Sequence, residues 1–454
     1  MSTAHAPAGK GGALRHLTQA VVLLLLFGLL YVVTRAVPEI HGPAGTIAAV
    51  GFLILAGTLA SELFEPLGLP HLSGYIAAGV VAGPHVLNLV DHHAVEDLKK
   101  VNDIALALIA LAGGAELRAH TLRKGFRSLM WHTLCQTVIV VFVMAAVFFA
   151  ARRFIPFAAA LPFAPAVGVA ILWGVLSVTR SPSATLGILS QTRATGPVAT
   201  HHLTFVMASD VVVTVLVAVA LTAVRPLIQP GATMSIHQLE HLGREILGSV
   251  ALGTTLGLVL AAYMRLIGKQ LILVFVALGF GATEVMRYLG FEALLVFMVA
   301  GFVVMNLSKQ GEKLIHSVED VASVVFVLFF ANAGAHLDLP VLKLMWPVAL
   351  VLGLSRAAAT WGAGRVASRF AKDAPVLRRW AWSGLVSQAG LALAFGGVMG
   401  RAFPSLGTGF ATLVVACVAL NEVVGPVLFK FALDRAGETA TAASRASLPN
   451  AKVE

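Results

Sequence analysis

The stretch LTFVMASDVVVTVLVAVALT, residues 203–222, decides the fold class of this chain. A helix of about 20 residues is about 30 Å long, which matches the thickness of the hydrocarbon core of a bilayer. Asp210 is the only charged residue in the stretch, and apolar residues flank it on both sides. The stretch therefore predicts a membrane-spanning helix that carries one carboxylate near mid-depth.

Similar apolar stretches recur along most of the chain. Hydrophobic residues make up 58% of the sequence, charged residues 12%, and the mean hydropathy is +0.88. A soluble fold has no means of burying so much apolar surface. We therefore expect an all-α polytopic membrane protein with about fourteen transmembrane helices. The expected spans are 17–36, 44–64, 69–87, 97–117, 127–151, 164–191, 196–225, 238–266, 269–287, 291–308, 317–337, 340–368, 377–400 and 407–433.

The distribution of Lys and Arg between these spans predicts the orientation. A cytoplasmic N-terminus places about two thirds of the basic residues in cytoplasmic loops, so both termini are expected inside the cell. The segments are then a cytoplasmic N-terminal tail at 1–16, an additional N-terminal transmembrane helix at 17–36, a membrane domain at 44–433 and a short cytoplasmic tail at 434–454. The net charge of +10 is therefore explained by loops that face the lipid bilayer, and we expect no nucleic acid partner.

Motifs of membrane and soluble enzymes are missing from the sequence. It contains no HExxH, no GxSxG and no Walker GxxxxGK[ST] motif. Cys135 and Cys417 lie in apolar segments without metal-ligand spacing. We expect no enzyme activity and no cofactor, so that any transport must draw its energy from an ion gradient.

Three charged side chains fall well inside predicted spans, where each needs a partner, a water cavity or a function. Asp210, with Ser209 beside it, is the candidate for binding a proton or a monovalent cation. Arg356 is either the charge partner of Asp210 or a structural arginine that binds carbonyls at a broken helix. Arg180 lies in the segment LWGVLSVTRSPSATLGIL, residues 172–189.

Two predicted spans carry signs of an interrupted helix. In the first, Pro182 removes a backbone donor, and Thr179 and Ser181 can bind freed backbone groups. In the second, Asn332 and Gly334 interrupt the apolar segment VLFFANAGAHLDL, residues 327–339. Two interrupted helices indicate a midplane ion site, because the ends of half-helices present dipoles and bare carbonyls to ions. Two ordinary kinks are the alternative.

Two further polar residues lie in the last predicted spans. They are Gln388 and Glu422, and a structural hydrogen bond near the kink at Pro426 is the simpler explanation for the glutamate.

Six stretches, in this order, resemble the monovalent cation:proton antiporter superfamily, specifically its Kef-like and NapA-like branch of sodium/hydrogen exchangers. They are GLPHLSGYIAAGVVAGP (68–84), DIALALIALAGGAEL (103–117), the segment 179–210, the segment 329–338, GLVSQAGLALAF (384–395) and LNEVVGPVLFK (420–430).

The resemblance implies a fold of the NhaA/NapA-like kind, with inverted repeats, two crossed broken helices beside the ion site, and a homodimer. The essential aspartate of that family falls on Asp210 and its basic residue on Arg356. The implied function is secondary active exchange of Na⁺ or K⁺ for H⁺ in pH homeostasis. We expect a multi-pass protein of the bacterial inner (plasma) membrane.

The sequence departs from the family pattern at two positions. Ser209 stands where members commonly carry Asp, Asn or Gln, so one carboxylate remains and one proton is expected per cation, which makes the exchange electroneutral. Arg180 replaces a small polar residue, and a fixed guanidinium competes with a cation for a carboxylate. The alternatives are a degenerate, non-exchanging protein of the same fold in which Arg180 locks Asp210, or a transporter of a different ion.

Overall fold

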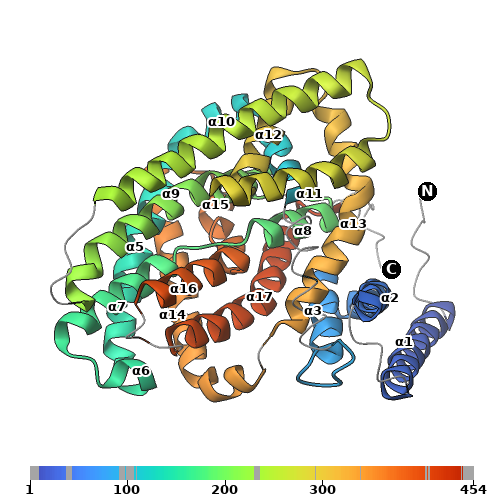
Figure 1. Ribbon diagram of the computed structural model, residues 1–454, viewed down its shortest axis with the longest axis horizontal. Coiled ribbons are helices and arrows are strands. Elements are labelled where there is room, and N and C mark those ends of the chain that lie inside the picture. Colours follow the sequence, from blue (N-terminus) through green and yellow to red (C-terminus); the bar gives the residue numbers. More distant parts are fainter. Residues whose placement is uncertain are drawn as a thin grey trace, which may run out of the picture. The chain divides into compact units, whose positions relative to one another are not determined.

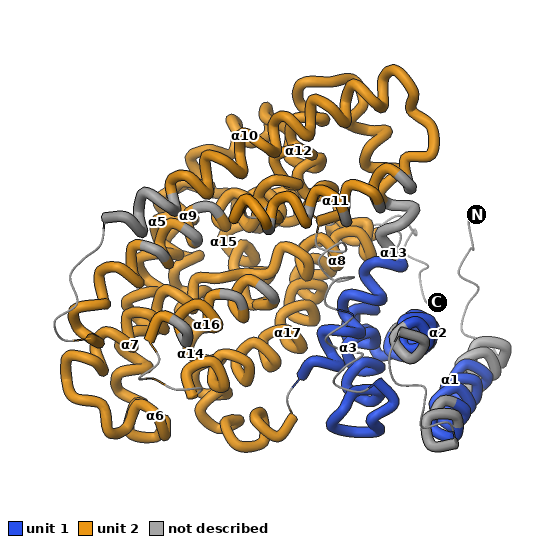
Figure 2. Tube along the Cα trace, viewed as in Figure 1, with its two compact units in different colours: residues 1–105, 323–337 blue, residues 106–322, 338–454 orange. Residues whose placement is uncertain are grey.

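The computed structural model contains helices and connecting segments only, within the residues that it describes. These are residues 10–36, 43–90, 98, 107–108, 110–229, 236–291, 293–337, 339–403, 406, 409–440 and 442. The chain divides into two compact units, one formed by residues 1–105 and 323–337, the other by residues 106–322 and 338–454 (Figure 2).

The first unit holds the N-terminal helices α1 (Lys10–Ala36), α2 (Pro43–Phe64) and α3 (His71–Ala82), together with the C-terminal part of α13 (Gly311–Ala335). Within it, α3 and α13 approach backbone to backbone at two glycines. A Cβ added at Gly79 would lie 1.8 Å from the carbonyl oxygen of Ala331, and one at Gly334 would lie 2.2 Å from that of Ile76. Only glycine permits this approach, so the small residues of the segment 68–84 serve helix packing.

The second unit holds the remaining helices, coloured from cyan to red in Figure 1. Its long helices α5 and α14 pack along each other, as do α10 and α12, α7 and α9, and α14 and α17. Besides the N-terminal part of α13 and a helical stretch at residues 110–116, the described helices of this unit include α5 (Ala119–Ala151), α6 (Pro156–Ala159), α7 (Phe163–Leu176), α8 (Pro182–Thr192), α9 (Pro197–Ile228), α10 (Ile236–Leu266), α11 (Leu271–Leu289), α12 (Ala293–Leu307), α14 (Leu339–Ala371), α15 (Pro375–Trp380), α16 (Gly390–Ala402) and α17 (Gly409–Ala436).

The helices coincide closely with the predicted spans, except that about half of the span 97–117 lies outside the described residues. Six helices in the described part of the chain are long and apolar enough to cross a membrane, or seven when the bent pair Pro375–Val386 and Leu391–Met399 counts as one span. The all-helical, multi-pass architecture is thus confirmed, and the number fourteen stays a prediction.

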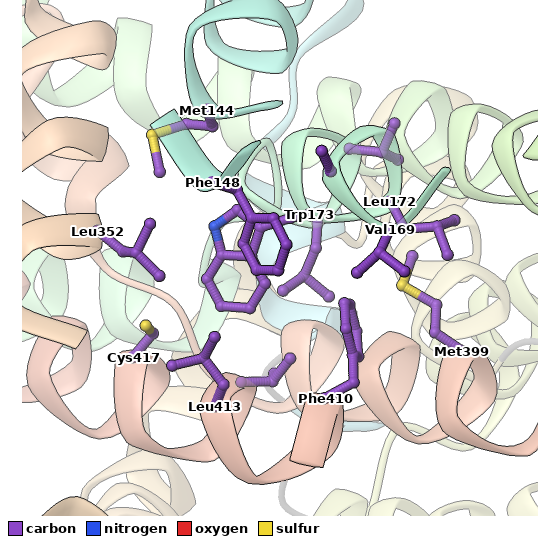
Figure 3. Close-up of a cluster of buried hydrophobic side chains, with 14 of the residues drawn as sticks. Met144, Phe148, Val169, Leu172, Trp173, Leu352, Met399, Phe410, Leu413 and Cys417 are labelled. Carbon is purple, nitrogen blue, oxygen red and sulfur yellow. The ribbon is translucent and has the colours of Figure 1, made fainter. Parts of the chain in front are cut away.

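An apolar core surrounds the C-terminal half of α7 (Figure 3). The Trp173 ring stacks on Phe148 of α5, with ring centroids 5.3 Å apart, and meets Phe410 of α17 edge to face at 5.8 Å. Aromatic pairs of this geometry contribute beyond the area that they bury. The core therefore fixes α7 immediately before the chain leaves the helix at residue 177.

One of the two predicted interruptions is wrong. Helix α13 runs without a break through Asn332 and Gly334 and ends only at Ala335. The segment contains no proline, and Gly334 is required for the contact with α3 described above. A glycine and a single Asn leave the backbone hydrogen bonds of a helix intact, so polarity alone was not sufficient to break it.

Candidate functional site

The first helix break is the segment 177–181 between α7 and α8, as the sequence predicted. Thr179 donates a hydrogen bond from Oγ1 to the Leu176 carbonyl at 2.7 Å. Ser181 caps α8, where its Oγ accepts from the Ala184 N–H at 3.1 Å, and Pro182 occupies the first helical position. A proline that needs no N–H partner and a serine that caps the next turn together favour the start of a new helix here.

The second break lies at residues 387–389, between the 3₁₀ turn η3 (Ser383–Val386) and α16. The two halves of this span, Pro375–Val386 and Leu391–Met399, are bent by 57°. The position contains Gln388, which the sequence offered only as a further polar candidate. Ser387 also packs closely on α17, because a Cβ at Gly425 would lie 2.2 Å from its Oγ.

Arg356 of α14 joins the two breaks. Its Nε donates to the Ser177 carbonyl at 2.8 Å and its Nη2 to the Thr179 carbonyl at 2.7 Å. On the other break, Nη1 donates to the Val386 carbonyl at 2.7 Å and Nη2 to that of Leu385 at 3.0 Å. The ends of both half-helices leave carbonyls without helical partners and carry partial negative charge. Of the two alternatives for Arg356, these hydrogen bonds fit the structural one.

Gln388 makes a second connection between the breaks and extends it to α17. Its Nε2 donates to Thr179 Oγ1 at 2.8 Å, and its Oε1 accepts from Asn421 Nδ2 at 2.8 Å. Beside these hydrogen bonds lies a cavity of about 10 Å³, whose lining is mostly apolar but includes Arg356, Gln388 and Asn421. That volume is about the size of one water molecule.

Arg180 leaves the first break toward α9. The side chain is only 3% exposed, its Nη1 donates to Ser209 Oγ at 3.0 Å, and its guanidinium lies 4.6 Å from the centre of the Phe205 ring. Its charge also attracts that of Asp210, which is partly buried. Phe205 and Ser209 are one helical turn apart, so they hold the guanidinium along one face of α9, next to the carboxylate.

Two other candidate residues are buried, each in its own surroundings. Asn332 is fully buried in the first unit, and neither its Oδ1 nor its Nδ2 has a hydrogen-bond partner among the described residues. Glu422 of α17 is 5% exposed, and no hydrogen bond to its carboxyl group is present in the described part of the chain. The structural hydrogen bond expected for Glu422 near Pro426 is therefore not observed there.

Comparison with known proteins identifies the family to which the chain belongs. Residues 50–433 match the family of transmembrane sodium/hydrogen exchangers. The chain belongs to that family. Its fold is similar to that of the sodium proton antiporter MjNhaP1 from Methanocaldococcus jannaschii, with a TM-score of 0.64 and 15% identity over 87% of this chain and 99% of that one. An electron-microscopy structure of the same antiporter gives a TM-score of 0.66 at 15% identity, covering 85% and 95% of the two chains. No curated protein sequence matches significantly.

Buried polar groups from several helices form a cluster around α9, and no local sequence pattern predicts their contacts. The His132 and His201 rings lie 4.4 Å apart, and His202 Nε2 accepts from the Gly384 N–H at 2.9 Å, which ties α9 to the second break. His132 Nε2 is 3.0 Å from Asp373 Oδ2. Burial alone raises the pKa of Asp373, but hydrogen bonds with His132 and two serines outweigh it and hold that pKa below its usual range.

The N-terminus of α9 is held by a side chain that no sequence pattern predicts. Glu438, in the polar segment after α17, is 7% exposed. Its Oε1 accepts from the Val198 N–H and its Oε2 from the Ala199 N–H, both at 2.8 Å. A carboxylate at a helix N-terminus satisfies orphan donors and complements the helix dipole. A single Glu in a polar tail has no distinctive pattern, so the sequence does not predict this contact.

Proposed function

We propose that the chain exchanges Na⁺ or K⁺ for H⁺ through Asp210. The observation that carries this proposal is the position of the Asp210 carboxylate in the apolar helix α9. Arg180, at the first helix break, donates a hydrogen bond to Ser209 in the same turn of α9. Membership of the sodium/hydrogen exchanger family and the fold of a sodium proton antiporter support it. In this mechanism, Asp210 binds either a proton or a dehydrated cation, and the loaded site becomes accessible from the other side of the membrane.

Oxygen atoms around Asp210 would replace the water shell of the cation. Ser209 Oγ already donates to the Val206 carbonyl at 3.1 Å and accepts from Arg180, so one lone pair remains for an ion. Hard cations prefer oxygen ligands, so we assign this hydroxyl oxygen to the cation shell.

Exchange is proposed to be electroneutral, because Ser209 stands where a second ionisable or amide group would be. One carboxylate then carries one proton in one direction or one monovalent cation in the other. The two ligands compete, so the apparent KM for the cation should rise about tenfold for each unit by which the pH falls below the pKa of Asp210.

A second candidate function rests on the burial of Arg180 next to Asp210. In that case the arginine neutralises Asp210 permanently, and the chain is a non-exchanging member of the family. Proteoliposomes distinguish the two. The wild-type protein should move protons when a Na⁺ or K⁺ gradient is applied, without a net current on a solid-supported membrane.

Asp210→Asn should abolish this exchange, while Asp434→Asn, which removes a carboxylate at the far end of α17 that pairs with Lys430, should leave it intact. Full exchange in Asp210→Asn would refute the role of Asp210. A folded wild-type protein without exchange of either cation would favour the locked protein, and a net current would refute electroneutrality.

A further inference from the structure

The helix pair α5–α14 ends in a concentration of positive charge. The two helices run antiparallel, as the contacts Arg127 Nη2 to the Phe370 carbonyl at 3.0 Å and Gln136 Nε2 to the Thr360 carbonyl at 3.0 Å show. The N-terminal turns of α5 and the C-terminal turns of α14 therefore lie together. With α15 they carry a set of exposed cations, here called the basic surface: Arg123, Lys124, Arg127, Arg365, Arg369 and Arg379.

Almost nothing in these segments neutralises that charge. The sequences 118–136 and 357–386 contain one acidic residue, Asp373. Its side chain is only 6% exposed and its carboxylate is directed to His132. The basic surface consequently faces its surroundings with uncompensated charge, and its ligand must be anionic.

Aromatic rings accompany the cations at the same level. Arg365 lies 5.1 Å from the centre of the Trp361 ring, and Arg379 lies 5.1 Å from that of Trp380. Trp131 of α5 stacks on Phe370 of α14 with centroids 4.9 Å apart. Trp side chains with Lys and Arg beside them are typical of the depth at which lipid headgroups meet the hydrocarbon core.

An apolar stripe continues from the basic surface along α5 toward the middle of the helix. Phe126, Met130, Leu134 and Val138 are spaced four residues apart and are 66%, 46%, 51% and 44% exposed. A ligand that fits both features has an anionic head and apolar chains. A soluble anion would leave the stripe without an occupant, and a symmetric contact between two copies centred here would bring like charges together.

We propose that the basic surface binds the headgroups of anionic phospholipids, whose acyl chains lie along the exposed stripe of α5. This inference depends on the membrane architecture and not on the proposed ion exchange. The positive-inside rule requires basic residues at this end for orientation, but it does not require them to bind lipid, so the two explanations differ in what they predict for the purified protein.

Quenching of Trp fluorescence tests the proposal, because four of the six Trp residues adjoin the basic surface: Trp131, Trp361, Trp380 and Trp382. The full-length protein is reconstituted in vesicles that contain brominated phosphatidylglycerol or brominated phosphatidylcholine at equal mole fractions. We expect stronger quenching by the anionic lipid, and a preference that weakens as salt is added.

The variant Arg123→Gln/Lys124→Gln/Arg369→Gln removes three cations that make no side-chain hydrogen bond within the described residues. Its preference for phosphatidylglycerol should fall about tenfold or more, since each cation near an anionic surface contributes roughly a fivefold factor. The matched control is Arg152→Gln/Arg153→Gln at the opposite end of α5, which should keep the wild-type preference. The three single variants should each lose part of it, which keeps the test valid if the triple variant does not fold.

The proposal is overturned if the wild-type protein shows no preference for the anionic lipid or if the triple variant retains it. Displacement of the effect by inorganic phosphate at constant ionic strength would identify a site for soluble anions instead. Efficient disulfide cross-linking between copies through Met130→Cys would show that a second protein copy covers the stripe, which also contradicts a lipid occupant.

Discussion

Arg180 Nη1 donates a hydrogen bond to Ser209 Oγ at 3.0 Å, which brings a buried guanidinium to the residue directly preceding the carboxylate of α9. The arginine is held there by a hydrogen bond and by the face of Phe205. Its charge attracts that of Asp210. A cation that approaches Asp210 is therefore repelled by the fixed positive charge of Arg180.

Arg180→Thr should increase the affinity of the site for Na⁺ or K⁺. The substitution removes the competing charge and adds a hydroxyl oxygen, so we expect the apparent KM for the cation to fall by about tenfold, equivalent to about 1.4 kcal/mol. Arg180→Lys keeps the charge and should keep the wild-type KM within a few-fold. Cation-driven proton flux in proteoliposomes measures both. If Arg180→Thr is folded but loses exchange, Arg180 supports ion binding and the competition proposed here is refuted.

The sequence was sufficient to predict most of the helices. Apolar stretches of membrane length are a strong signal, and the predicted spans 44–64 and 127–151 correspond to α2 and to most of α5. The break at Pro182 was also predictable, because proline removes a backbone donor and cannot continue the preceding turn. These features depend on local sequence, where the physical constraint is simple.

The second break was not predictable in the same way. Residues 387–389 contain no proline, and their Ser and Gln resemble many polar residues that lie in continuous membrane helices. The competing segment at Asn332 has as strong a polar signal but remains helical. What distinguishes them is tertiary: Arg356 binds the Leu385 and Val386 carbonyls, and such contacts between segments distant in sequence leave no local pattern.

Arg356→Ala should destabilise the protein strongly. Four carbonyls at the two breaks would lose their donor, and each buried group without a partner costs about 1 to 3 kcal/mol. We expect the free energy of unfolding to fall by at least about 3 kcal/mol, and the Tm in detergent to fall by about 5 °C or more. Arg356→Lys should be intermediate, because an ammonium group offers three donors in a different geometry.

The exposed Arg365 on the same helix provides a matched control, since surface substitutions usually change stability by less than about 0.5 kcal/mol. Equal Tm values for Arg356→Ala and Arg365→Ala would contradict the assignment of Arg356 as the connection between the breaks.

Gln388 and Asn421 should be energetically coupled. The amide of Gln388 contacts Thr179 and Asn421 at once, so each single substitution to Ala leaves a buried polar partner without its hydrogen bond. The double variant removes both partners of the 2.8 Å contact between them. A double-mutant cycle on unfolding in mixed micelles should therefore give a coupling energy of about 0.5 kcal/mol or more. Strict additivity of the two substitutions would show that the hydrogen bond contributes nothing to stability.

Asp373→Asn should lower stability in a manner that depends on pH. The pKa of Asp373 is depressed in the folded protein, because hydrogen bonds with His132, Ser128 and Ser368 outweigh the opposing effect of burial. The carboxylate therefore binds protons more weakly when folded than when unfolded. Its stabilising contribution is present above the unfolded pKa of about 3.9 and is lost as the pH falls through the lower, folded value. Thermal melts of the wild-type protein and Asp373→Asn should consequently differ at neutral pH and converge below about pH 4.

Asp434→Asn, at the C-terminal end of α17, is the control, and its melting curve should follow that of the wild-type protein. A constant difference between wild type and Asp373→Asn from neutral pH to the acid limit would mean that the charge of Asp373 does not stabilise the fold, and the polar cluster around His132 would then be held by packing alone.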